Sequence, residues 1–447
     1  MALTLPAHPD PLHDGLAAGD LLHDLSHAFG GPFHFVLPER FDANLAAFRA
    51  ALDEAEVEGT VYFAKKANKA AAFVERCAHA GAGVDVASHG ELREALGHGV
   101  RGEDIVVTGP AKAEPLLRVA ALQGALIAVD SLDELSRVLH LDVPRPVRIL
   151  LRRFPPTRTG SRFGLTDDQL DTALRRCAAA KERVRMEGFS FHLSGYDVQP
   201  RTDLAGELVE LCLKARLLGL QADRISIGGG FAVDYVPAEA WHTFLAEQGP
   251  DDYHARKSFS TSDFYPYHSP VAGADALRAV LAARPHGTGD PLARRLREAG
   301  VMLLLEPGRA LLAGAGSSVF AVQGVKDRPG YGIVTVDGSS LSLSEQWFNS
   351  EYLPDPLLLT PHPDQDAAEY RACVGGASCL DSDLLTWRKI AFPRRPRVGD
   401  LLVYPNTAGY QMDSNESPFH DLPLPAKVVI HHENGRLRWR LDRRPAL

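Results

Sequence analysis

Short runs of apolar residues recur along the first two thirds of the chain. Eight of them are predicted to be buried strands: TVYFA (60–64), AGVDVA (82–87), DIVVTG (104–109), LIAVD (126–130), VRILLR (147–152), GFSFHL (188–193), RISIGGG (224–230) and VMLLLE (301–306). Helical patterns lie between them. Before the first run, for example, Phe41, Leu45, Phe48 and Leu52 are spaced by four, three and four residues and so share one helix face.

Two of the predicted helices have clear N-terminal caps. Ser88 with Glu91, and Ser131 with Glu134, each place a hydroxyl three residues before a carboxylate, directly after a strand. Parallel strands need helical crossovers, and eight such strands can close into a barrel. We therefore expect an α/β protein with a (β/α)8 TIM barrel. An open, doubly wound sheet would alternate in the same way and remains the alternative.

The pattern changes at two places along the chain. Residues 231–300 are too long for an ordinary barrel connection and are predicted to be an insertion, as a lid, an interface or a substrate wall. After residue 313, strands follow without helices between them, and Asn434-Gly435 is a strong hairpin signal. We expect an N-terminal segment (1–30) packed on a β domain, a barrel domain (31–313), and a C-terminal β-rich domain (314–447) of barrel or sandwich type.

Composition narrows the partners of the protein. A net charge of -9, with 48 Lys and Arg along 447 residues, provides no dense basic surface for nucleic acid or an anionic membrane. We expect small-molecule partners. The five cysteines form no CxxC pair, which argues against a disulfide framework and a thiolate metal site. The sequence has no signal-peptide pattern and no run long enough to span a bilayer, which indicates the cytoplasm.

Polar residues end the predicted strands, where a barrel gathers its catalytic groups. They are Lys65 and Lys66, Asp85, Arg152, His192, glycines 228–230, and Glu306 with Arg309. Strand alternation puts only one of the two lysines at the barrel mouth. Partial desolvation there would lower the lysine pKa toward the neutral amine that forms a Schiff base. Two solvated lysines at a strand end would be the simpler explanation.

The other strand ends offer complementary chemistry. Glycines 228–230 can present backbone N–H groups to a phosphate, although they would also suit a flexible connection. Glu306 and Arg309 flank a Pro-Gly turn, as a surface ion pair could also do. His192 follows an apolar run, where a histidine is often a core residue. Together, an amine, a phosphate cradle, an acid for a ring nitrogen and a flat side chain are what pyridoxal phosphate requires.

The motif FAKKAN (63–68) resembles the Y-A-x-K-A-N signature of the fold-type III pyridoxal-phosphate decarboxylases, the ornithine and diaminopimelate decarboxylase family with an alanine racemase-type barrel. The resemblance covers nearly the whole chain except residues 231–300. It implies a barrel followed by a β domain, in a homodimer with shared active sites. It continues in order through AGVDVASHGEL (82–92), SRFG (161–164), FSFHLSG (189–195), GGG (228–230), EPGR (306–309), GGASCLDSD (375–383) and NTAGYQMDSN (406–415).

The resemblance also implies roles for single residues. Lys66 would carry the cofactor while Lys65 faces away, His192 would stack on the pyridine ring, and Glu306 would pair with the ring nitrogen. Cys379 would reach the partner subunit's active site, contact the substrate and protonate Cα. Further cofactor contacts are expected from Asp85, Ser194, Gly228, Gly229, Gly230, Arg309 and Tyr410. Further substrate contacts are expected from Asp337, Asp381, Asp383 and Tyr410.

The implied reaction is decarboxylation of an amino acid through an external aldimine and a quinonoid. The aspartates suggest a diamino acid of the ornithine, lysine or diaminopimelate type. Two departures fall where its side chain should bind: Leu380 follows Cys379 where the family has an acid, and HLSG replaces the common HIGS. The alternatives are a racemase or epimerase, which would place an arginine rather than Glu306 at the ring nitrogen, and a non-catalytic pyridoxal-phosphate carrier, which resembles a lone barrel.

Overall fold

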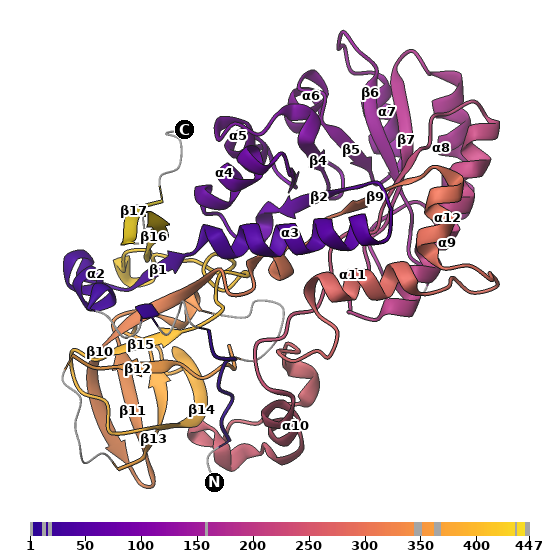
Figure 1. Ribbon diagram of the computed structural model, residues 1–447. Coiled ribbons are helices and arrows are strands. Elements are labelled where there is room, and N and C mark those ends of the chain that lie inside the picture. The colour runs from indigo at the N-terminus through magenta and orange to yellow at the C-terminus, as the bar shows by residue number, and fades with distance from the viewer. Residues whose placement is uncertain are drawn as a thin grey trace.

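The computed structural model describes residues 3–10, 15–16, 20–156, 160–343, 351–361, 368–433 and 436–442. They form a closed parallel barrel and a separate β domain beside it (Figure 1). The barrel strands are β2 (Gly59–Ala64), β3 (Gly83–Val86), β4 (Ile105–Val107), β5 (Leu126–Val129), β6 (Val147–Arg152), β7 (Val184–Ser190), β8 (Arg224–Ser226) and β9 (Met302–Leu305). Because β9 also pairs with β2, the barrel is closed. This confirms the TIM barrel and excludes the open sheet.

Helices cover the outside of the barrel. They are α3 (Pro38–Glu54), α4 (Ala71–Ala80), α5 (His89–Gly97), α6 (Glu114–Leu122), α7 (Leu132–Leu139), α8 (Asp167–Ala179), α9 (Val198–Leu217), α11 (Gly273–Ala282) and α12 (Leu292–Ala299). Both predicted caps are present, since Ser88 and Ser131 each accept a hydrogen bond from the backbone N–H of the glutamate three residues later, at 3.1 Å.

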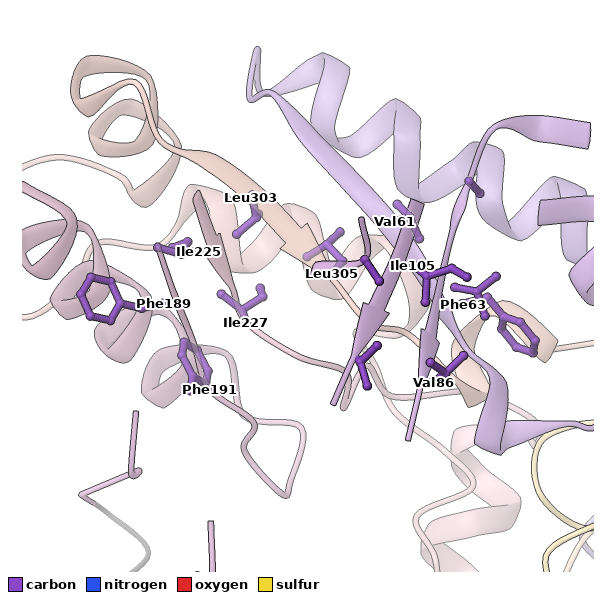
Figure 2. Close-up of a cluster of buried hydrophobic side chains, with 14 of the residues drawn as sticks. Val61, Phe63, Val86, Ile105, Phe189, Phe191, Ile225, Ile227, Leu303 and Leu305 are labelled. Atoms are coloured by element: carbon purple, nitrogen blue, oxygen red, sulfur yellow. The ribbon is translucent and has the colours of Figure 1, made fainter. Parts of the chain in front are cut away.

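Strand alternation separates two layers of the barrel core. Val61 and Phe63 belong to the large cluster that the strands share with the helices (Figure 2). Tyr62, between them, packs instead with Val106 and Leu126 inside the barrel. The interior is therefore filled by side chains, and the polar groups that follow each strand are left at one open end.

Within the described residues, the β domain is a sheet of nine strands. They are β1 (Phe33–Val36), β10 (Gly316–Arg328), β11 (Tyr331–Val336), β12 (Leu357–Leu359), β13 (Tyr370–Gly375), β14 (Leu384–Phe392), β15 (Leu401–Tyr404), β16 (Ala426–Glu433) and β17 (Arg436–Leu441). β16 and β17 pair as antiparallel strands, while Asn434 and Gly435 of the predicted hairpin lie outside the described residues. No helix in the described ranges is long and apolar enough to cross a membrane.

The N-terminal region contributes to this sheet. β1 lies between β10 and β16, although its residues fall within the range that we predicted for the barrel. All four of its residues are buried, as expected for a central strand. Helix α2 (Leu21–Phe29) packs Leu22 and Leu25 into the same core as Phe33 and Val319. The exact domain boundaries stay a prediction.

Residues 231–300 contact both domains. Helices α11 and α12 complete the outer layer of the barrel (Figure 1). Helix α10 (Ala238–Glu247) and the short 3-10 helices η3 (Pro250–Asp252), η4 (His254–Arg256) and η5 (Thr261–Asp263) precede them. Tyr253, Tyr265 and Tyr267 share one core with Phe320 and Tyr404 of the sheet. The aromatic residues of the insertion therefore anchor it to the β domain.

Candidate active site

The two lysines lie just beyond the first barrel strand. β2 ends at Ala64, and Lys65 begins the 3-10 turn η1 (Lys65–Ala67). Strand alternation therefore stops before it can separate the lysines, and this part of the sequence argument does not apply. The turn itself separates them. Lys65 is only 3% exposed, whereas the Lys66 side chain is 44% exposed and its Nζ lies 3.3 Å from Oδ2 of Asp85.

The charge state of Lys66 differs from our expectation. Desolvation lowers the pKa of Lys66, as we predicted. The charges of Asp85, the Tyr410 phenol and Glu306 outweigh this effect, so the pKa of Lys66 is raised overall. The prediction was wrong in direction because it considered desolvation without the neighbouring acids. Asp85 is held in place by Thr108, whose hydroxyl donates to Oδ1 at 2.6 Å.

Glu306 follows β9 and is 7% exposed. Its Oε1 accepts a hydrogen bond from the Ser226 hydroxyl at 2.5 Å. Burial and the nearby Asp85 raise the pKa of Glu306 to about 7, although Ser226 and Lys66 act in the opposite direction. A cation beside this carboxyl, such as a protonated ring nitrogen, would favour the ionised form.

The glycines 228–230 form a loop with no space for side chains. A Cβ would lie 2.7 Å from Nδ1 of His192 at the first position and 2.5 Å from the Glu306 carbonyl oxygen at the second. The backbone φ angles of Gly228 and Gly230 are +67° and +79°, in the region that favours glycine. The N–H of Gly229 donates to Nδ1 of His192 at 3.4 Å, so the histidine lies on this loop.

Arg201, near the start of α9, holds the other side of the glycine loop. It is 2% exposed and donates hydrogen bonds to the carbonyls of Ile227, Gly229 and Gly230, at 2.9, 2.6 and 3.1 Å. Burial lowers the pKa of Arg201 to about 10. The loop carbonyls are thereby bound to a buried guanidinium, which fixes the loop conformation.

Arg309 is the cation of the EPGR motif. Its Nη1 donates to the Gly409 carbonyl at 2.9 Å and to Gln411 Oε1 at 3.1 Å. The guanidinium carbon lies 4.0 Å from the ring centre of Tyr265 and 4.9 Å from that of Tyr410. The arginine is therefore held between two tyrosine rings, an arrangement that orients a guanidinium.

Tyr410 reaches the barrel from the β domain. It has a φ of +78°, which is rare for a bulky residue, and its N–H donates to the Ala67 carbonyl at 2.8 Å. Its hydroxyl lies 2.8 Å from where a Cβ on Gly308 would be, so glycine is needed there. Asn68 makes a second link, since its amide donates to the Ala408 carbonyl at 2.8 Å. The lysine turn is thus bound directly to the β domain.

Three of the predicted substrate residues, Cys379, Asp381 and Asp383, lie in the loop between β13 and β14. Cys379 and Asp381 are exposed there. Asp383 is buried and accepts hydrogen bonds from the backbone N–H groups of Ser340 and Ser378, at 2.7 and 3.1 Å. Among the described residues, no hydrogen bond or ion pair joins Cys379, Asp337, Asp381 or Asp383 to Lys66.

Two further predicted site residues are Asp337 and Ser194. Asp337 follows β11, and its Oδ1 accepts the N–H of Ala321 at 2.9 Å. Burial raises the pKa of Asp337 to about 6, so it is largely ionised at neutral pH. Ser194 is exposed in the turn after His192.

Sequence reasoning missed several residues that shape the site. Ser226 could have been found, because it lies on the inward face of β8 between the outward Ile225 and Ile227. Thr108 directly follows β4, at a strand end like the other site residues. Arg201 and Tyr265 gave no comparable signal, because each meets the site through a contact between segments far apart in the sequence.

The residues present fit pyridoxal phosphate. Lys66 provides an amine, Glu306 a nearly buried acid and Arg309 a guanidinium, and the glycine loop is packed too closely against its neighbours to carry side chains. A barrel with these groups, followed by a β domain, defines a pyridoxal-phosphate enzyme of the decarboxylase type.

Comparisons with known proteins give the same class. Residues 39–248 match the pyridoxal-binding domain of pyridoxal-dependent decarboxylases. Over 424 residues, the chain is 40% identical to the uncharacterized protein y4yA of Sinorhizobium fredii, covering 94% of this chain and 92% of that protein. It is 27% identical over 435 residues, 95% of each protein, to diaminopimelate decarboxylase of Deinococcus radiodurans.

The fold comparison extends over both domains. The structure of diaminopimelate decarboxylase from M. jannaschii in complex with L-lysine matches with a TM-score of 0.73 at 19% identity, covering 95% of this chain and 91% of that one. The chain belongs to the pyridoxal-dependent decarboxylases, as a divergent member. The predicted family, the cofactor and the class of enzyme, an amino-acid decarboxylase, are thereby confirmed.

Proposed function

We propose that the protein decarboxylates a diamino acid of the ornithine, lysine or diaminopimelate type. The observation that carries this proposal is the placement of Glu306. This nearly buried acid lies at the same barrel mouth as Lys66 and Asp85, and it interacts electrostatically with both of them. Pyridoxal phosphate, when bound, supplies an electron sink for the electron pair that decarboxylation leaves on Cα. A carboxylate at the ring nitrogen strengthens such a sink, whereas the arginine expected of a racemase would weaken it.

In this proposal, residues of the chain divide the work at the barrel mouth. The amine of Lys66 would hold the cofactor covalently, and Asp85, 3.3 Å from that amine, would stabilise it as an ammonium group when it is free. Glycines 228–230, Arg309 and Tyr410 bind the phosphate, and His192 and Ser194 line the cofactor from the side of β7. Two tyrosine rings hold the arginine, which supports its role at the phosphate.

We further propose that the site is completed by a second copy of the chain in a homodimer. Cys379 of the partner subunit would protonate Cα, and Asp337 and Asp381 of the partner subunit would face the distal amine. Leu380 and Phe419 support this arrangement. They flank Cys379 and its neighbour His420 and are 49% and 41% exposed, which suits a surface covered by a partner. Asp383 would act by shaping the Cys379 loop.

The direct test is carbon dioxide release from a panel of D- and L-amino acids. We expect release from at least one diamino acid, with one amine product formed per carbon dioxide. Asp337→Asn should raise KM for that substrate by about 10-fold or more, because a charge-assisted hydrogen bond contributes about 1.5–3 kcal/mol. No release from any amino acid, with the cofactor fully retained, would contradict the proposal and favour a carrier.

A further inference from the structure

Cys379 is paired with a histidine from another segment. Its Sγ lies 3.2 Å from Nε2 of His420, which belongs to the short turn η8 (Phe419–Asp421) that precedes β16. Both residues are exposed in the chain. The other four cysteines, Cys77, Cys177, Cys212 and Cys373, are buried. Cys379 is thus the one thiol that combines access to solvent with an imidazole partner.

The loop of Cys379 is held in one conformation. The Asp383 carbonyl accepts the N–H of Gly376 at 2.8 Å, and its carboxylate binds the two N–H groups described above. A Cβ at Gly376 would lie 2.3 Å from the Asp383 carboxylate, so only glycine fits. The thiol therefore lies within a short, internally bonded loop.

The turn of His420 is also constrained. His420 and Asp421 both have left-handed φ angles, +62° and +58°, and the N–H of Asp421 donates to the Pro418 carbonyl at 2.9 Å. The Phe419 ring packs against the imidazole with ring centres 4.3 Å apart. The imidazole is therefore directed at the thiol by its backbone and by its neighbour.

We propose that His420 is the residue that returns a proton to Cys379 after each turnover, a role that rests on the proposed decarboxylation. The S–H bond of Cys379 breaks as its proton forms the new C–H bond at Cα, which leaves a thiolate. The imidazolium Nε2–H of His420 then transfers its proton to that thiolate, and a water molecule that enters the shared active site reprotonates the imidazole. In total, one solvent proton replaces the carboxyl group. His420 acts through Cys379 and is a positioning residue.

The first experiment does not depend on activity. Cys379 is alkylated with iodoacetamide between about pH 6 and 9 and quantified by mass spectrometry of its peptide, and the four buried cysteines should not react. In His420→Gln, which can hydrogen-bond but cannot carry the proton, we expect alkylation at neutral pH to be about 10-fold slower. His286→Gln alters an exposed histidine bound to Asp203 and should match wild type. Equal pH profiles in wild type and His420→Gln, or no reaction in either, would overturn the inference.

The second experiment uses any substrate that releases carbon dioxide. His420→Ala should retain its cofactor and KM but lose about 10-fold in kcat, and added imidazole should restore part of that loss. An unchanged kcat, or a loss that imidazole does not relieve, would overturn the relay. If wild type released carbon dioxide from no amino acid, the proposed function would fail, while the alkylation result would still report on the thiol–imidazole pair.

Discussion

Glu306 shows how much the surroundings of one side chain determine its chemistry. It is buried beside another acid, Asp85, and these two effects raise its pKa to about 7. The hydrogen bond from Ser226 partly offsets them. Without cofactor, this carboxyl changes its charge near neutral pH. A cation placed at this position would hold it ionised.

A pH-dependent stability follows for the cofactor-free protein. Between pH 4.5 and about 7, the folded protein keeps a proton on Glu306 that the unfolded chain has released, so the free energy of unfolding falls as pH rises through this interval. In Glu306→Gln this loss should disappear. The difference between the two proteins should change by up to about 3 kcal/mol, at about 1.4 kcal/mol per pKa unit.

Urea unfolding of both proteins across this pH range measures the effect. Glu298→Gln, which alters an exposed glutamate on α12, should follow the wild-type curve. Parallel pH curves for wild type and Glu306→Gln would show that the acid has an ordinary pKa in the folded state.

At the residue scale, strand ends could be read from the sequence, but charge states could not. Lys66, His192 and Glu306 each follow an apolar run and Asp85 lies near the end of one, and this pattern predicts that they meet at one end of the barrel. The direction of the Lys66 pKa shift depends on how closely Asp85 and Glu306 approach it, and no local pattern encodes these distances.

At the scale of elements, the insertion supports the cofactor site indirectly. Tyr265 is 2% exposed, its hydroxyl accepts a hydrogen bond from the Tyr196 hydroxyl at 2.8 Å, and its ring lies against the guanidinium of Arg309. The same tyrosine belongs to the core that fixes the insertion to the β domain. The insertion is therefore a wall behind the predicted phosphate arginine.

Replacing this ring should weaken cofactor binding. In Tyr265→Leu we expect the dissociation constant for pyridoxal phosphate to rise about 10-fold or more, because a desolvated cation–π contact contributes about 2 kcal/mol. Tyr265→Phe keeps the ring and should stay within a few-fold of wild type. A cofactor titration followed by absorbance measures both variants. Equal losses in the two would indicate that the hydroxyl, and not the ring, holds Arg309.

The periodicity of the sequence located all eight barrel strands but misplaced some of their limits. β7 begins at Val184, before the predicted GFSFHL run, because Val184 and Met186 already alternate into the core. β1 was missed as a strand of the sheet, since FHFV lies next to a barrel helix in sequence and pairs with strands that follow hundreds of residues later. Such pairing leaves no signal in the local pattern.

At the scale of the whole molecule, the β domain clamps the segment that bears the lysines. Asp413 accepts the N–H of Lys69 at 2.6 Å and forms a buried ion pair with Lys427. Burial raises the pKa of Asp413, but Lys427 and the hydrogen bonds outweigh this and lower it to about 2. The ionised Asp413 therefore stabilises the folded protein above pH 3.8, and this stabilisation is lost only as pH falls toward 2.

Breaking this clamp should affect stability and cofactor binding together. Asp413→Asn leaves Lys427 buried without a counter-charge, so the free energy of unfolding at neutral pH should fall by about 3 kcal/mol. The variant should also bind pyridoxal phosphate more weakly, because the turn of Lys66 loses its support. Glu416→Gln removes the carboxylate that pairs with Lys69 and is a control expected to cost less than about 1 kcal/mol. Equal stability of the Asp413 variant and wild type would contradict the clamp.

The proposed shared active site predicts complementation between inactive variants. Lys66→Ala and Cys379→Ala, mixed and allowed to exchange subunits, should form mixed dimers with one intact site each. Half of all dimers would be mixed, so about a quarter of wild-type activity should return. Lys66→Ala mixed with Glu306→Ala is the matched control and should stay inactive, because both changes affect the same side of the site. No recovery in the first mixture would mean that the sites are not shared.

The central claim is a covalent bond between Lys66 and pyridoxal phosphate, and borohydride trapping tests it most directly. The purified holoenzyme is reduced, digested and mapped by mass spectrometry, alongside Lys65→Ala and Lys66→Ala. We expect the cofactor label on Lys66 in wild type and in Lys65→Ala, and no label in Lys66→Ala. A label on Lys65, or no trapped cofactor in the wild-type protein, would contradict the account.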